Sequence, residues 1–186
     1  VAIVGETGAG KSTLVNLVCR FYEPTAGKIL IDGRDVRDRA QIWLHSQIGY
    51  VLQTPHLFSG SVAENLRYGN TEATEEEMWQ ALRLISADKV VEKMGQGLQS
   101  DVGEGGDSLS TGEKQLLSFA RVLLADPRIF VLDEATSSVD SETERLIQNA
   151  TETVMRGRTS FVIAHRLSTI RNADVILAVR GGKIVE

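Results

Sequence analysis

The sequence has one cysteine, no long apolar run and no recognisable signal peptide, and each absence excludes a class of protein. The lone Cys19 rules out an intrachain disulfide, which fits a reducing compartment. Cys19 lies in a helical apolar pattern, where we expect a buried and inert thiol. No apolar stretch approaches the roughly 20 residues that a helix needs to cross a bilayer.

An excess of positive charge is also missing. The chain has 20 Lys and Arg against 25 Asp and Glu, so its net charge is −5. No basic stripe stands out that could displace counterions from a nucleic acid, and a nucleic-acid-binding surface is therefore disfavoured. Hydrophobic residues make up 42% of the 186 residues, enough to bury a sizeable core.

What is present is an alternation of short apolar runs with helical patterns. The runs lie at Val1–Val4, Ile48–Leu52, Ile129–Leu132, Ser160–Ala164 and Val175–Val179. This alternation predicts an α/β fold with a mostly parallel sheet covered by helices. Between Gly27 and Val36, alternating apolar residues around an Asp32-Gly33 turn predict a β-hairpin arm instead.

The middle of the chain has no convincing core strand. Thr74 and Glu77 fit a capping box, which predicts the start of a helix that runs from Glu75 to about Met94. Its apolar residues recur at helical spacing, and we interpret the stripe as packing. The stripe consists of Met78, Trp79, Leu82 and Ile85.

These patterns predict an α/β core, residues 1–53 and 127–186, interrupted by a helical subdomain, residues 54–126. Val1 already reads as part of a buried strand, so we expect the chain to begin inside its domain.

A phosphate-binding loop follows the first strand. Gly-Glu-Thr-Gly-Ala-Gly-Lys-Ser at residues 5–12 matches the P-loop pattern, and a helical pattern runs on from Ser12 to Tyr22. The glycines let successive N–H groups point at phosphate oxygens. Lys11 should reach the β- and γ-phosphates, and the Ser12 hydroxyl should ligate Mg²⁺. The predicted ATP-binding residues are Gly5, Glu6, Thr7, Gly8, Ala9, Gly10, Lys11, Ser12 and Thr13.

Two acids, Asp133 and Glu134, follow the apolar run Ile129–Leu132. Open α/β sheets bind ligands at the carboxyl ends of their strands. Asp133 suits the Mg²⁺ shell, and Glu134 is placed to polarise the attacking water as a general base. Paired acids can also begin an ordinary solvated loop, but behind a P-loop they predict nucleotide hydrolysis. No Asn-Lys-x-Asp guanine reader occurs, which disfavours a GTPase.

The segment Leu-Ser-Thr-Gly-Glu-Lys-Gln at residues 109–115 resembles the Leu-Ser-Gly-Gly-Gln-x-Gln signature of ABC transporter nucleotide-binding domains. Ser110 and Glu113 also fit a capping box, so a well-capped helix is the alternative reading. The resemblance implies that Ser110, Thr111, Gly112 and Glu113 contact the γ-phosphate of ATP held by an opposite subunit. Thr111 and Glu113 depart from the family's glycine and glutamine.

The resemblance extends over essentially the whole chain, in the family's order. It implies that Gln53 is the Q-loop glutamine, which joins Ser12 and Asp133 around Mg²⁺ and Glu134 and His165 in catalysis. Residues 138–140, Ser-Val-Asp, resemble the D-loop, with Asp140 as its acid. His165 is similar to the switch histidine, although a lone histidine at a strand end is usually structural. Residues 102–106, Val-Gly-Glu-Gly-Gly, are similar to the exporter X-loop.

The family resemblance therefore implies an ATPase that powers an ABC exporter, with ATP and Mg²⁺ as cofactors. It implies as partners a second nucleotide-binding domain, identical or related, and a transmembrane domain, at the cytoplasmic face of the cell membrane. The family's adenine-stacking aromatic lies upstream of the P-loop, beyond Val1.

Three alternative functions share some of these motifs. A chromosome-organising or DNA-repair ATPase would place a long coiled coil between Lys11 and Ser110, whereas only about a hundred residues without heptads separate them. A module that holds ATP without cutting it is disfavoured by the presence of Glu134 and His165. Against an importer ATPase stand only the X-loop and residues 164–167, Ala-His-Arg-Leu.

Overall fold

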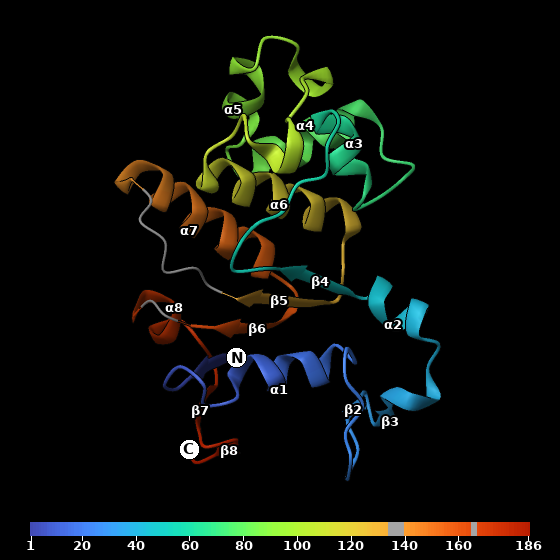
Figure 1. Ribbon diagram of the computed structural model, residues 1–186, viewed down its shortest axis with the longest axis vertical. Coiled ribbons are helices and arrows are strands. Elements are labelled where there is room, and N and C mark those ends of the chain that lie inside the picture. Colours follow the sequence, from blue (N-terminus) through green and yellow to red (C-terminus); the bar gives the residue numbers. More distant parts are fainter. Residues whose placement is uncertain (134–139, 165–166) are drawn as a thin grey trace. The chain divides into compact units, whose positions relative to one another are not determined.

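A computed structural model describes residues 1–133, 140–164 and 167–186 of the chain (Figure 1). The described residues form two compact units. The first comprises those of Val1–Tyr50, Pro127–Ala135 and Thr159–Glu186, and the second those of Val51–Asp126 and Thr136–Arg158. The division into residues 1–53 with 127–186 and residues 54–126 stays a prediction.

The first unit is built on a six-stranded sheet with the order β4-β5-β6-β1-β7-β8. Strands β5, β6, β1 and β7 pair in parallel, and β8 is antiparallel to its neighbour β7. The predicted α/β fold with a mostly parallel sheet is confirmed. The strands are β1 (Ala2–Val4), β4 (Ile48–Val51), β5 (Ile129–Asp133), β6 (Thr159–Ile163), β7 (Ile176–Arg180) and β8 (Lys183–Ile184).

Helix α1 (Lys11–Val18) packs beside this sheet and closes a common apolar core. The core joins Ile3 of β1, Val15 and Cys19 of the α1 segment and Val131 of β5, all fully buried. Each such aliphatic side chain contributes about 1.5–3 kcal/mol by leaving water. Cys19 is buried as predicted, and burial raises the pKa of its thiol to about 11.

Helix α1 ends at Val18, so the helix predicted to Tyr22 is too long. Arg20 adopts a left-handed backbone, φ 56°, which turns the chain out of the helix. Its guanidinium Nη1 donates to the carbonyls of Val36 and Arg39, both at 3.0 Å. These long-range bonds stabilise the early end, which no local pattern in the sequence indicates.

The predicted hairpin arm is present as β2 (Leu30–Ile31) and β3 (Arg34–Asp35). Asp32 and Gly33 both have positive φ, 51° and 74°, which matches the turn that joins closely paired strands. A short turn, Val36–Asp38, and helix α2 (Gln41–Ser46) lead on to β4. Helix α8 (Leu167–Arg171) lies between β6 and β7 in sequence.

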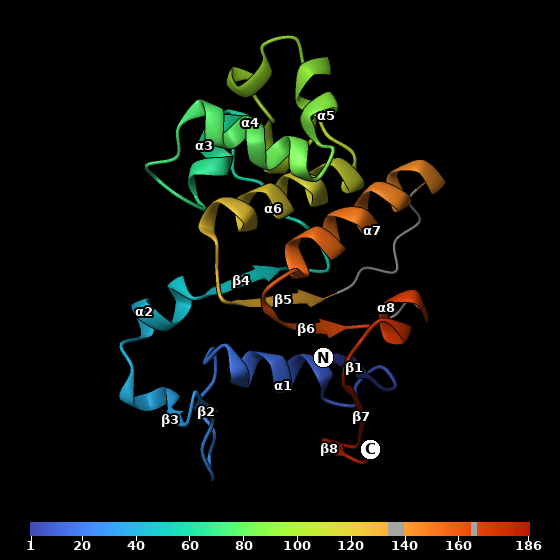
Figure 2. The same cartoon turned by 180° about the vertical axis from the view of Figure 1, so that it is seen from behind.

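The second unit is helical, as predicted for the middle of the chain. Its long helix α6 packs against α3, α4 and α7 (Figure 2). Among its described residues after strand β4, the only β-pairing is an isolated bridge between Ser61 and Asp101. The helices are α3 (Val62–Arg67), α4 (Glu75–Leu84), α5 (Asp88–Lys93), α6 (Thr111–Ala125) and α7 (Ser141–Met155).

The single helix predicted from Glu75 to about Met94 is wrong, because the segment forms α4 and α5. Ser86 between them has a left-handed backbone, φ 58°, and the N–H of Ala87 donates to the carbonyl of Leu82. The capping box of Thr74 and Glu77 is confirmed. No described helix of the chain is long and apolar enough to cross a membrane.

Candidate functional site

The loop between β1 and α1 curls around the side chain of Lys11. Lys11 is only 7% exposed, and its ammonium donates to the carbonyls of Gly5 at 2.8 Å and Glu6 at 3.0 Å. No carboxylate of the described residues pairs with it. A buried cation without a counterion is costly, so this loop is suited to bind an anion.

The backbone of the same loop also offers donors. Gly8 and Gly10 have positive φ, 80° and 105°, and the N–H of Ala9 donates back to the carbonyl of Glu6 at 3.1 Å. The N–H groups at the start of α1, those of Lys11, Ser12 and Thr13, donate to no residue in the described ranges. Unsatisfied N–H groups at a helix start attract phosphate.

A support behind the loop was not identified from the sequence. The N–H of Gly182, in the β7–β8 turn, donates to the carbonyl of Ala9 at 2.8 Å. A Cβ added at Gly5 would collide with the carbonyl oxygen of Val179, and one at Gly10 would come within 3.4 Å of Gly182. In the sequence, the adjacent Gly181 and Gly182 were the signal that could have indicated a tight turn here, and both have positive φ.

Asp133 lies at the same edge of the sheet as the loop. It is in register with Ile163 of β6, and Ile163 is in register with Ile3 of β1, two residues before Gly5. Two strand spacings place Asp133 about 10 Å from β1. Asp133 is half-buried, and its charge adds to burial in raising the pKa of Tyr50 to about 12.

The described residues fit a magnesium ion only in company with phosphate. No group of three or more His, Cys, Asp or Glu in the described part of the chain could hold a metal ion alone. The exposed Ser12 hydroxyl on α1 and the Asp133 carboxylate at the same sheet edge are both oxygen ligands. Mg²⁺ is often held by one or two such groups together with phosphate oxygens and water.

The signature segment begins α6 in the second unit. Ser110 is the N-cap residue: its hydroxyl accepts from the N–H of Glu113 at 3.3 Å and donates to the Glu113 carboxylate at 2.8 Å. The capping box is thus confirmed. Ser110 and Thr111 are exposed and Gly112 is buried. The N–H groups of Thr111 and Gly112 donate to no described residue.

Two of the remaining predicted site residues, Gln53 and Asp140, belong to the second unit. Gln53 is exposed two residues after the end of β4. Asp140 caps α7 by accepting from the N–H groups of Glu142 and Thr143, which lowers the pKa of its carboxyl. Glu134 and His165 lie outside the described residues.

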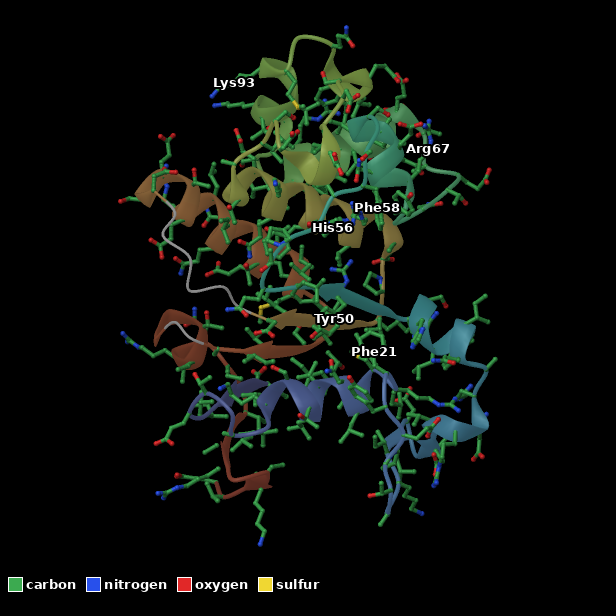
Figure 3. All side chains as sticks on the ribbon, in the orientation of Figure 1. Phe21, Tyr50, His56, Phe58, Arg67 and Lys93 are labelled. Carbon is green, nitrogen blue, oxygen red and sulfur yellow. The ribbon has the colours of Figure 1, made fainter. Side chains whose placement is uncertain are left out.

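An aromatic cluster in the second unit was also missed from the sequence (Figure 3). His56 meets Phe58 edge to face, with ring centroids 5.3 Å apart, and Tyr68 lies tilted against Phe58 with centroids 4.3 Å apart. Phe58 and Tyr68 are 43% and 62% exposed. The guanidinium of Arg121 lies 5.8 Å from the Phe58 ring and 5.7 Å from the Tyr68 ring. The sequence offers no periodic signal for this cluster, because its members come from a loop and the end of helix α3.

The family model described as ABC transporter matches residues 1–137 of the chain. The whole chain is 55% identical to 30% of the fatty acid ABC transporter ATP-binding/permease protein of Mycobacterium bovis. It is 50% identical to 14% of ABC transporter B family member 21 of Arabidopsis thaliana. The chain thus spans less than a third of the length of these relatives.

A solved structure agrees with these matches. A bacterial Atm1-family ABC exporter with ATP bound aligns with 100% of this chain and 32% of its own at a TM-score of 0.90 and 41% identity.

Proposed function

The chain belongs to the ABC transporter family, as an ATP-hydrolysing domain similar to those of exporters, and from this premise we propose that its β1–α1 loop binds Mg·ATP and that hydrolysis there drives export. The observation that carries the proposal is the Lys11 ammonium, buried in the loop and bound only to the carbonyls of Gly5 and Glu6 among described residues. A phosphate would supply its missing counterion.

Residues 5–13 of the loop hold the phosphates. The N–H groups of Lys11, Ser12 and Thr13 donate to phosphate oxygens, and Lys11 turns its ammonium toward the β- and γ-phosphates. Ser12, Asp133 and Gln53 would hold Mg²⁺, which when bound neutralises phosphate charge during transfer.

Catalysis falls to residues that follow strands of the sheet. Glu134 accepts a proton from the attacking water as general base, and His165 donates to the γ-phosphate. Gln53 orients the water. These roles come from the family resemblance.

Two domains act together in this proposal. Ser110, Thr111, Gly112 and Glu113 of one domain close over the γ-phosphate held by the other, with Asp140 at the seam. The exposed Ser110 and the two open N–H groups at the start of α6 support this arrangement. The partner is a second copy or a close relative.

The third partner is the transmembrane domain, at the cytoplasmic face of the membrane. We assign its docking to the aromatic cluster of His56, Phe58 and Tyr68. Two exposed, stacked rings on a helical unit are typical anchors of protein interfaces. The Mycobacterium bovis relative named above is an ATP-binding/permease protein, and the region of the cluster follows Gln53 directly.

Two substitutions test the proposal. Lys11→Ala should weaken Mg·ATP binding by about 100-fold in calorimetry, because it removes the only buried cation that the loop offers. Lys28→Ala, at an exposed lysine of the hairpin arm, is the control and should bind as the parent does.

Glu134→Gln should keep that affinity and lower turnover by about 10²–10⁴. Unchanged affinity in Lys11→Ala would contradict the phosphate site. Parental turnover in Glu134→Gln would show that this residue is not the base.

A further inference from the structure

Asn65 of α3 is a buried polar side chain of the second unit. It is 1% exposed, and its amide makes four hydrogen bonds. Its oxygen accepts from the N–H of Phe58 at 2.9 Å, while its nitrogen donates to the carbonyls of Phe58 at 2.8 Å and Ser61 at 3.1 Å. The amide therefore binds both the N–H and the carbonyl of Phe58, as the backbone of a neighbouring β-strand would.

The fourth bond of Asn65 comes from Arg121 of α6. Arg121 Nη2 donates to the Asn65 side-chain oxygen at 3.1 Å, and Nε donates to the Asn65 carbonyl at 3.0 Å. Nη1 reaches the carbonyl of His56 at 3.5 Å. A planar guanidinium can make these three contacts at once, and a lysine ammonium cannot reproduce the fork.

Arg121 also contacts the exposed rings of Phe58 and Tyr68. Its guanidinium faces both Phe58 and Tyr68 at less than 6 Å from each centroid. No ion pair links it to an acid in the described ranges. The half-buried Arg121 guanidinium therefore contacts carbonyls and aromatic rings and no acid, and we interpret its role as holding the loop of His56 and Phe58 in position.

Helix α6 connects this arrangement to the signature. Ser110 caps its first turn, and Arg121 lies eleven residues further along, about 16 Å at the helical rise. Gly69 packs directly on the backbone of Arg121, where no Cβ could fit. The aromatic cluster is thus fastened to the helix whose start carries Ser110.

We propose that Asn65 and Arg121 are positioning residues that fix the aromatic cluster of His56, Phe58 and Tyr68 to α6, so that the docking surface and the signature segment move as one piece. The proposal rests on the docking role assigned above to the cluster. It assigns no chemistry to either residue, because neither lies on the nucleotide loop.

The test uses the full-length protein in nanodiscs of phosphatidylethanolamine and phosphatidylglycerol, with ATPase kinetics and hydrogen exchange as readouts. In Asn65→Ala and Arg121→Met, exchange at the Phe58 amide should accelerate by about tenfold, because its acceptor is lost or freed. The kcat per folded molecule should fall by about tenfold, while the KM for ATP stays within about twofold. Asn65→Asp keeps the volume and the acceptor of the Phe58 N–H but loses both N–H donors to the carbonyls of Phe58 and Ser61. Its kcat should fall in the same direction, which keeps the test open if Asn65→Ala does not fold.

The matched control is Arg67→Met, on the same helix as Asn65. No side-chain hydrogen bond links Arg67 to a described residue, so this variant should keep parental kinetics and exchange. Phe58→Ala separates the two proposals. Parental kcat in Phe58→Ala would overturn the docking surface itself. A low kcat there, with parental kcat per folded molecule in the Asn65 and Arg121 variants, would overturn the positioning role alone.

Discussion

At the scale of single residues, burial has opposite consequences for the reactivity of two side chains of the first unit, Lys11 and Cys19. Lys11 is buried in a loop whose backbone N–H groups at the start of α1 are open to a ligand. Cys19 is buried among aliphatic side chains, and desolvation alone raises the pKa of its thiol. The first arrangement prepares a residue for binding, and the second withdraws a residue from chemistry.

The raised pKa of Cys19 predicts a loss of stability in alkali. The pKa of the thiol is about 11 in the folded chain against 9.0 in the reference state, so the folded state holds the proton more tightly. The contribution of this proton to the free energy of unfolding is fully present below pH 9. It is lost as the pH rises from 9 to 11, by up to about 2 kcal/mol.

Urea unfolding between pH 7 and 10.5 measures this effect. The free energy of unfolding of Cys19→Ala should fall less steeply above pH 9 than that of the parent. Tyr50, whose pKa is raised to about 12, contributes in the same direction, and Tyr50→Phe serves as the companion variant. Equal slopes for parent and Cys19→Ala would contradict the prediction.

At the scale of elements, the contact between α3 and α6 depends on a glycine whose backbone needs no special freedom. Gly69 has no positive φ, yet a Cβ there would collide with the carbonyl oxygen of Arg121. Gly69→Ala should therefore destabilise the domain by about 3 kcal/mol through overpacking.

Gly95→Ala is the comparison for that prediction. A Cβ at Gly95 meets no atom within 4 Å, and its positive φ of 84° costs only about 1 kcal/mol. Thermal melting should rank the parent first, Gly95→Ala second and Gly69→Ala last. Equal melting temperatures for the two variants would show that α3 can move away from α6.

The elements also mark how far the sequence could be read. The five apolar runs, the Asp32-Gly33 hairpin and the Thr74 and Ser110 capping boxes carry their structural cause in adjacent residues, and all appear in the structure. The early end of α1 depends on bonds from Arg20 to Val36 and Arg39, far away in sequence. The break between α4 and α5 falls at Ser86, a residue without a marked preference for positive φ.

The same distinction holds for the site. The P-loop is a contiguous pattern, so the residues around Lys11 could be named from the sequence alone. Its support by Gly182 comes from the other end of the chain, and only the paired glycines indicated a turn there. Asn65 and Arg121 are 56 residues apart, and their hydrogen bonds leave no trace in local periodicity.

At the scale of the whole molecule, the nucleotide loop and the signature belong to different compact units of the chain. Lys11 is in the first unit and Ser110 in the second, and each presents open N–H groups to an anion. Two anion-binding helix starts in one chain, with a single γ-phosphate per nucleotide, favour a pair of domains in which each completes the other's site.

Complementation in the full-length protein tests this shared site. Ser110→Arg should abolish ATPase activity in a homodimer, because it blocks the signature at both sites. Lys11→Ala should also be inactive, because neither copy holds ATP productively. Co-expressed with different tags and purified through both, the two variants form heterodimers in which one site has an intact Lys11 and an intact Ser110. Activity should return to at most about half of the parental rate, since one of the two sites is complete. Doubly tagged dimers of a single variant are the controls and should stay inactive. ATPase activity in the Ser110→Arg homodimer would contradict the shared site, since no intact signature would remain to close either site.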